Sequence, residues 1–188
     1  MPEIYLMMNK PAGYVCSAAS DSHKTVYELL PLELQDLVKN AKRGHRLHTI
    51  GRLDADTTGL LLFTTDGKFS HMIAANGLIS KTYEAVLLHE VTSAQQAQYI
   101  KLAAQGLTLP PEKKAPEQQA APATLSFINE TTCRIKISEG KFHEVRRIFR
   151  ALGNEVKELK RIAIGPLLLP DSLNPGEYTS FSPEQILF

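Results

Sequence analysis

Residues 60–65 (LLLFTT) constrain the fold more than any other stretch of this 188-residue chain. The segment is largely apolar, is too short for a stable helix, and runs into Asp66-Gly67, a pair typical of a turn. Such a run is typical of a strand in the centre of a sheet. Because 43% of the residues are hydrophobic, the chain can bury a real core, as one large domain or as two small lobes.

The other predicted elements are short and mixed, which indicates an α+β fold. Period-two alternation predicts a hairpin from ATLSFINE and TCRIKISEG, with its turn near residues 129–131. We predict further strands at 4–8 and 81–90, and helices at 25–39 (interrupted by Pro31), 68–76, 93–105, 143–152 and after Ser182-Pro183.

Residues 109–122 (LPPEKKAPEQQAAP) concentrate proline and charge and lack large apolar side chains after the first residue. This composition predicts a mobile loop rather than a part of the core. A boundary between two lobes could lie in this segment.

Composition excludes several classes of protein. No apolar run approaches the roughly 20 residues needed to span a bilayer, and we expect a soluble cytoplasmic protein. Cys16 and Cys133 lack metal-ligand spacing, which favours two reduced thiols, although a disulfide stays open. His45 and His48 have no third ligand nearby in the sequence, so we expect no metal, and no dinucleotide or P-loop motif occurs.

The charges nearly cancel, with 21 Lys and Arg against 20 Asp and Glu, but their distribution is uneven. Residues 37–53 carry five basic side chains and no acidic one, and residues 134–161 hold nine against four. In the helix expected at 143–152, His143, Arg147 and Arg150 lie opposite the apolar face, and Arg146 lies at the border. These features favour a phosphate backbone as partner, whereas the alternative is an ordinary solvated cationic face.

The segment GRLDADTTG places Asp54 and Asp56 directly before the central strand. Aspartate is common in turns, so either residue taken alone could be structural. A carboxylate at the mouth of a buried strand can instead act chemically if a cation keeps it ionised. Arg52 and Arg146 are the candidate cations.

Four ordered segments resemble the pseudouridine synthases of the RsuA type: LMMNKPAGYVCS, GRLDADTTGLLLFTTDG, KTYEAVL and ISEGKFHEVRRIFRALGNEVKELKRIAIG. The resemblance covers almost the whole chain. It implies the pseudouridine synthase fold, a mixed and mainly antiparallel sheet with flanking helices and a central active-site cleft. It also implies one catalytic domain over residues 1–188, without metal or redox cofactor and without the S4-like RNA-binding domain that many relatives carry in front.

The same resemblance assigns roles to single residues. Asp54 matches the catalytic aspartate, Tyr83 the tyrosine stacked on the target uracil, and Arg146 the basic residue that pairs with the aspartate. Ile137 matches the apolar residue beneath the base, while Glu144 stands where glutamine is usual. The remaining residues expected to bind the substrate are Arg52, Lys81, His143, Arg147 and Arg150.

The function that this resemblance implies is isomerisation of a uridine in ribosomal RNA, as free RNA or in an assembly intermediate, by a monomer. The small-subunit (16S) rRNA is favoured, with the large-subunit (23S) rRNA as the alternative. Asp54 would attack covalently or remove the 2′ proton to give a glycal, and the sequence does not choose between these. Two rival functions are a hydrolase that uses both Asp54 and Asp56, and a non-catalytic RNA-binding or ribosome-assembly module.

Overall fold

The computed structural model describes residues 2–42, 44–74, 77–113 and 115–187. It divides into two compact units, one formed by Met1–Ile79 with Arg161–Phe188 and the other by Ser80–Lys160. The expected α+β class is confirmed. Neither boundary between the two units falls within residues 109–122, where the composition suggested that one could lie. In the described ranges, no helix has the length and apolar character needed to cross a membrane.

The first unit is built around β5 (Thr58–Thr64), which confirms the central strand predicted at 60–65. Leu60, Leu61, Leu62 and Phe63 are fully buried. The antiparallel strands on the two edges of β5 set Met7 and Ile50 opposite Leu62. The strands of this unit are β1 (Tyr5–Lys10), β4 (His48–Ile50), β5, the end of β11 (Val156–Ile164), β12 (Leu167–Leu168) and β13 (Tyr178–Ser180), with a small parallel pair β2 (Tyr14–Val15) and β3 (Lys24–Thr25).

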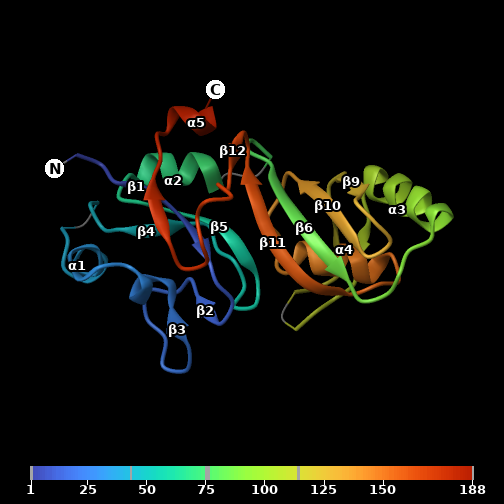
Figure 1. The fold of residues 1–188 in the computed structure, drawn as a ribbon, viewed down its shortest axis with the longest axis horizontal. Helices are drawn as coiled ribbons and strands as arrows, with labels where there is room; N and C mark the ends of the chain where they lie inside the picture. Colours follow the sequence, from blue (N-terminus) through green and yellow to red (C-terminus); the bar gives the residue numbers. More distant parts are fainter. Residues whose placement is uncertain (1, 43, 75–76, 114, 188) are drawn as a thin grey trace. The chain divides into compact units, whose positions relative to one another are not determined.

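Helices cover both faces of this sheet (Figure 1). On one face, α2 (Gly67–Ala74) and α5 (Glu184–Leu187) share a core with the side chains of Leu60 and Leu62. On the other, Tyr27 of the 3-10 helix η1 (Val26–Leu29) meets Phe63 edge-on at 5.7 Å. The predicted interruption at Pro31 is confirmed, because α1 (Leu32–Lys39) begins directly after it. The predicted end of α2 at residues 75–76 lies outside the described residues.

The second unit is a sheet with two helices on one face (Figure 1). The predicted hairpin is confirmed as β9 (Thr124–Phe127) and β10 (Thr132–Ile137), and β10 pairs in turn with β6 (Lys81–Leu87). The alternating side chains of β10 point into a core closed by α3 (Ser93–Gln105) and α4 (Glu144–Ala151). β11 begins in this unit and ends in the first.

Helix α3 has the predicted bounds because local signals define both of its ends. Thr92 and Gln95 form a reciprocal capping box, in which each backbone N–H donates to the side chain of the other residue. Gly106 ends the helix with φ 81°, and a Cβ there would lie 2.7 Å from the carbonyl oxygen of Ala120. Glycine at this position therefore lets the segment after α3 pack closely.

The prediction that residues 109–122 lie outside the core is wrong. The segment pairs through β7 (Thr108–Leu109) and β8 (Gln118–Gln119), and the side chains of Leu109 and Ala120 are buried. Pro110, Pro111 and Pro116 lie between these two strands, where composition alone suggested a loop. Its mobility stays a prediction.

Candidate active site

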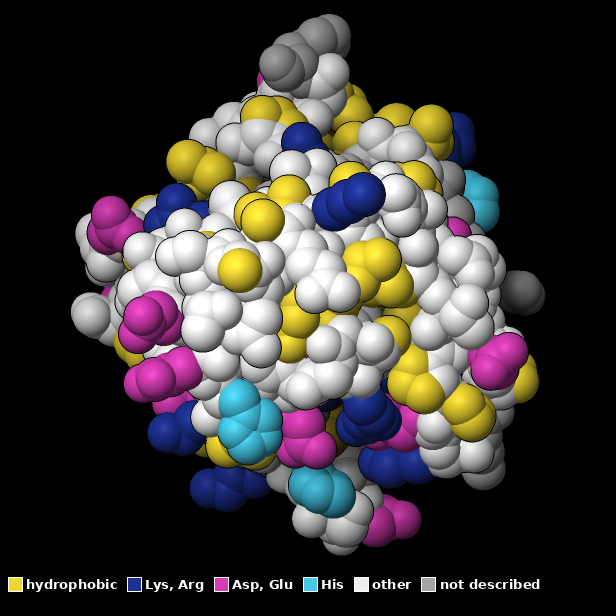
Figure 2. Space-filling model, turned by 90° about the vertical axis from the view of Figure 1, so that its right-hand side faces the viewer, with side chains coloured by type: hydrophobic (Ala, Val, Ile, Leu, Met, Phe, Trp, Pro, Cys, Tyr) yellow, Lys and Arg dark blue, Asp and Glu magenta, His cyan; other side chains and the backbone are white. Residues whose placement is uncertain are grey.

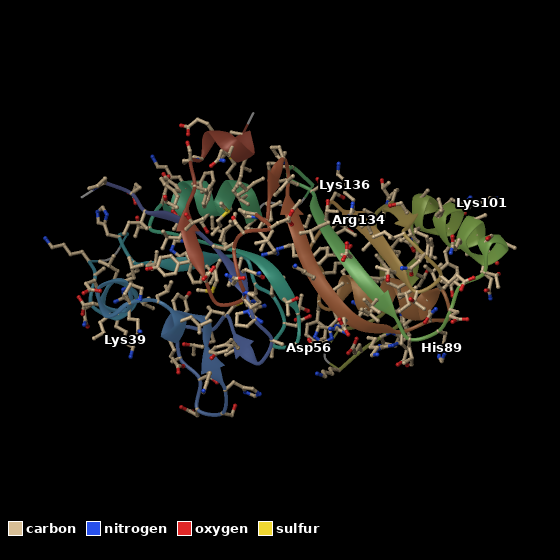
Figure 3. The ribbon with its side chains drawn as sticks, viewed as in Figure 1. Lys39, Asp56, His89, Lys101, Arg134 and Lys136 are labelled. Carbon is tan, nitrogen blue, oxygen red and sulfur yellow. The ribbon has the colours of Figure 1, made fainter. Side chains whose placement is uncertain are left out.

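Asp54 lies in a tight turn that leads into β5. The N–H of Thr57 donates to the carbonyl oxygen of Asp54 at 3.1 Å, so Ala55 and Asp56 occupy the centre of the turn. Asp54 is half-buried. Asp56, which Figure 3 labels, is exposed. The two carboxylates therefore have different environments although they are two residues apart.

Lys10, at the end of β1, holds this turn from inside the first unit. Its side chain is fully buried, and Nζ donates to the carbonyl oxygens of Pro11 at 3.0 Å, Ala55 at 3.2 Å and Thr57 at 2.8 Å. Burial lowers the pKa of Lys10, while the ionisable groups of Cys16, Asp56 and Asp54 act in the opposite direction. A buried cation thus fixes the backbone on the C-terminal side of Asp54.

Cys16 fixes the backbone on the N-terminal side of Asp54. Its Sγ donates to the carbonyl oxygen of Leu53 and accepts from the N–H of Leu53, both at 3.4 Å. Burial raises the pKa of this thiol. Cys16 and Cys133 are both free and buried, so the prediction of two reduced thiols is confirmed. Burial also raises the pKa of Cys133, to about 12.

Lys10→Met is expected to lower turnover about 10- to 100-fold, because misplacing a catalytic group by about 1 Å can cost about 10²-fold. Methionine keeps the apolar stem but removes the three hydrogen bonds to the backbone. The turn still forms, since Gly13 N–H also donates to Ala55 O at 2.7 Å. Steady-state kinetics beside thermal unfolding checks this expectation. Lys68→Met, an exposed lysine of the same unit, is the control, and equal turnover in the two variants would contradict the role of Lys10.

Tyr83 and Arg146 belong to the second unit, whereas Asp54 belongs to the first. Tyr83 lies on β6 opposite Ile135, is partly buried, and packs against the core of its unit. Arg146 is half-buried on α4, and its Nη1 donates to the carbonyl oxygen of Val156 at 3.1 Å. The predicted border position of Arg146 is confirmed, and its pairing with Asp54 stays a prediction.

Arg147 corrects the sequence prediction. It was expected to point away from the core and to bind substrate, but its side chain is fully buried. Its guanidinium donates to four neutral oxygens: Pro110 O at 2.8 Å, Pro116 O at 2.6 Å, Phe142 O at 3.2 Å and Gln118 Oε1 at 2.9 Å. Three of these oxygens belong to the described residues of segment 110–118, so Arg147 binds that segment and its side chain is not exposed to solvent.

His143 and Arg150 share Glu112, a residue of the same covering segment. Glu112 Oε1 lies 3.0 Å from His143 Nδ1, and Arg150 Nη1 donates to Glu112 Oε2 at 3.1 Å. Burial acts to raise the pKa of Glu112, but the hydrogen bonds and charges of His143 and Arg150 outweigh it and hold this pKa below its ordinary value. Arg150 keeps 44% of its side chain exposed. Both predicted substrate residues are thus in intramolecular contacts.

The remaining predicted residues lie in several environments. Arg52 is exposed before the Asp54 turn, and Lys81 is half-buried at the start of β6. Ile137 pairs in register with Lys81 and is buried in the core of the second unit. Glu144, the departure from the usual glutamine, is buried, accepts from Lys141 N–H at 2.8 Å, and has its pKa raised by burial.

Sequence reasoning missed Lys10 and Glu112. A lysine at the end of an apolar strand and before Pro11 looks like the end of that strand, although a charge next to a buried segment could have signalled an internal partner. Glu112 stood in a segment expected to be mobile. In the described ranges, no group of three or more His, Cys, Asp or Glu side chains is arranged to hold a metal ion.

Comparisons with known proteins agree with the four motifs. Residues 4–151 match the family model described as RNA pseudouridylate synthase. The chain is 41% identical to "Ribosomal small subunit pseudouridine synthase A" of Salmonella typhimurium over 97% of its own length and 72% of that protein. The protein with the same description from Escherichia coli (strain K12) is 40% identical over the same shares.

Solved structures give the same result for the fold. "Crystal structure of pseudouridylate synthase" aligns with a TM-score of 0.82 at 37% identity, covering 99% of this chain and 73% of that one. "Crystal Structure of a Cbf5-Nop10-Gar1 Complex" aligns with a TM-score of 0.60 at 19% identity, over 92% of this chain and 52% of that one. The latter shows a shared fold alone.

Proposed function

Because this chain belongs to the RNA pseudouridylate synthase family, we propose that it converts a specific uridine of small-subunit (16S) ribosomal RNA to pseudouridine. The observation that supports this choice of substrate is the 41% identity, over 97% of the chain, to a relative described as "Ribosomal small subunit pseudouridine synthase A". Asp54, in the turn whose backbone is held by Lys10 and Cys16, would supply the catalytic carboxylate.

In this proposal Asp54 attacks the nucleotide covalently or removes its 2′ proton to give a glycal, and both routes lead to the same product. The bond between C1′ and N1 breaks, the uracil rotates, and C1′ bonds to C5. On the covalent route the bond between Asp54 and the nucleotide breaks before the product forms, and on the glycal route the 2′ proton returns to C2′. C5 loses its proton and N1 gains one, so no atom is lost and no oxidant is needed. Lys10 and Cys16 support this role because they fix the backbone on both sides of Asp54.

Arg146 and Tyr83 complete the proposed site. An ionised carboxylate that leaves water needs a cation nearby, and Arg146 would pair with Asp54. Tyr83 would stack on the extruded uracil, offsetting the few kcal/mol that unstacking a nucleotide costs. Arg52 and Lys81 would contact the adjacent phosphates, and Ile137 would pack beneath the base.

Mapping of pseudouridine in ribosomal RNA tests the reaction and the target together. In cells of the source organism that lack the gene, we expect one pseudouridine of the small-subunit RNA to be missing, and the gene on a plasmid to restore it. Loss of a pseudouridine from the large-subunit RNA instead would show that the 23S RNA, the alternative substrate, is the target. An unchanged map in both RNAs would contradict the enzymatic activity and favour a binding module.

The proposal places the protein in the cytoplasm, where ribosomes are assembled, and has it act as a monomer. Modification assays with free 16S transcript and with partly assembled small subunits would identify the preferred form of the RNA. Sedimentation of the purified protein would test the monomer, and a stable dimer would contradict it.

A further inference from the structure

Phe142 exposes an aromatic ring just before α4. The ring is 44% exposed, and it stacks on the His143 imidazole with the centroids 3.8 Å apart and the planes at 15°. An exposed phenylalanine alone is unremarkable on a protein surface. This one has a fixed orientation, because its neighbour holds one side of the ring.

His143 is itself held in an unusual conformation. Its backbone is left-handed, with φ 47° and ψ 34°, which is uncommon for a residue other than glycine. Such a conformation persists only where surrounding contacts determine it, and it is frequent at functional sites. Here the His143 carbonyl oxygen accepts from Arg147 N–H at 2.9 Å, and Nδ1 contacts Glu112.

Two cationic residues are connected to this pair of rings through Glu112. Glu112 and Ala115 exchange two backbone hydrogen bonds, at 2.9 and 2.8 Å, and these close a tight turn that presents the exposed Lys113 with φ 51°. Arg150 contacts the Glu112 carboxylate, and its side chain is 44% exposed. Arg150 is thus bonded to Glu112, and Lys113 follows Glu112 in the chain. Phe142 directly precedes His143. Buried Arg147 fastens the covering segment that carries Glu112 and Lys113.

A polyanion would meet such local charges rather than the formal net charge of +1. Figure 2 shows that on the face it draws, basic, acidic and histidine side chains gather toward the lower edge, and charged side chains are fewer across the middle. An exposed flat ring that is linked to cationic side chains through Glu112 suits a nucleobase with its phosphates, because any base can stack and the phosphates pair with Lys and Arg. A protein partner would instead require a wider apolar patch than one ring offers.

We propose that Phe142, Lys113 and Arg150 form a contact for RNA in addition to the residues that hold the target uridine. The exposed side of the Phe142 ring stacks on an unpaired base, and Lys113 and Arg150 bind the phosphates beside it. This inference rests on the proposed function, since the RNA is its substrate. The contact contributes affinity and takes no part in the chemical step.

Phe142→Ala in the full chain is the decisive variant. With a small-subunit RNA transcript, we expect Kd and KM to rise roughly 10-fold, as loss of one stacked base predicts, while kcat at saturating RNA stays within about 2-fold. Phe142→Trp restores binding because indole also stacks. Lys113→Ala reduces the slope of log K against log salt by about 0.7–0.9, the share of one phosphate contact.

Matched controls lie elsewhere in the same unit. Ile128→Ala removes an apolar side chain that is 52% exposed, and Lys101→Ala removes an exposed lysine from α3 (Figure 3). Neither should change Kd or the salt slope. Wild-type affinity in Phe142→Ala, failure of Phe142→Trp to restore binding, or a fall in kcat at unchanged KM would overturn the proposed contact.

Failure of the proposed function gives a different result. If the wild-type protein forms no pseudouridine in any ribosomal RNA, the reaction is wrong. The Kd values of Phe142→Ala, Phe142→Trp and the two controls still decide whether this surface binds RNA. If wild type is active and its Kd and KM equal those of Phe142→Ala, the surface contact alone is wrong.

Discussion

Asp54→Asn is expected to abolish pseudouridine formation. Loss of a general base typically lowers turnover by roughly 10²–10⁴-fold, and we expect a fall of about 10³-fold or more here. Asparagine has nearly the same shape but cannot act as a nucleophilic or basic carboxylate. The turn itself is made by the backbone of Asp54 and by Lys10 and Cys16, so its structure should persist. Release of tritium from C5-labelled uridine in a 16S transcript measures the loss, and thermal unfolding checks that the variant is folded at the assay temperature.

Asp56→Asn is the matched control for Asp54→Asn. It makes the same chemical change two residues away in the same turn, at an exposed position. We expect turnover within a few-fold of wild type. A loss equal to that of Asp54→Asn would contradict the assignment of a single catalytic carboxylate and favour a mechanism that uses both. Full activity in Asp54→Asn would remove the aspartate from the chemistry altogether.

Arg147→Ala is expected to destabilise the second unit by about 3 kcal/mol or more, because each buried acceptor that loses its donor costs about 1–3 kcal/mol. The substitution leaves four oxygens without their donor and opens a cavity between α4 and segment 110–118. Denaturant unfolding measures the stability, and limited proteolysis should show earlier cleavage within 110–118 than in wild type.

The neighbouring arginine provides the control for Arg147→Ala. Arg146→Ala removes a hydrogen bond to Val156 from a half-buried side chain, so we expect a smaller loss of stability. Under the proposed mechanism, the same variant loses most of its turnover because Asp54 loses its cation. Equal stability of Arg147→Ala and wild type would contradict the structural role of Arg147. Full turnover in Arg146→Ala would contradict its pairing with Asp54.

Elements defined by neighbouring residues were predictable from the sequence. Helix 93–105 is confirmed to the residue, because Thr92, Gln95 and Gly106 supply both ends locally. The hairpin of β9 and β10 follows from alternation, and the central strand from an apolar run bounded by a turn. The family was predicted from four motifs that occur in the expected order along the chain, and the family model confirms it.

Exposure of individual charged residues was not predictable in the same way. A helix face rich in arginine predicts a solvated or RNA-binding face, yet Arg147 is fully buried. Its partner Pro110 lies 37 residues away, in a segment whose composition predicts a loop. Periodicity tells which residues share a face of a helix, but it does not tell what covers that face.

The sequence by itself determined the α+β class, the main elements, the family and the position of Asp54 directly before the central strand. Tertiary structure alone decided that Lys10 holds that turn and that Arg147 holds segment 110–118. Both side chains carry charge into the interior, which is favourable only when enough oxygens surround the charge. Those oxygens come from residues as far as 47 positions away, as between Lys10 and Thr57, so only the folded chain brings them to the cation.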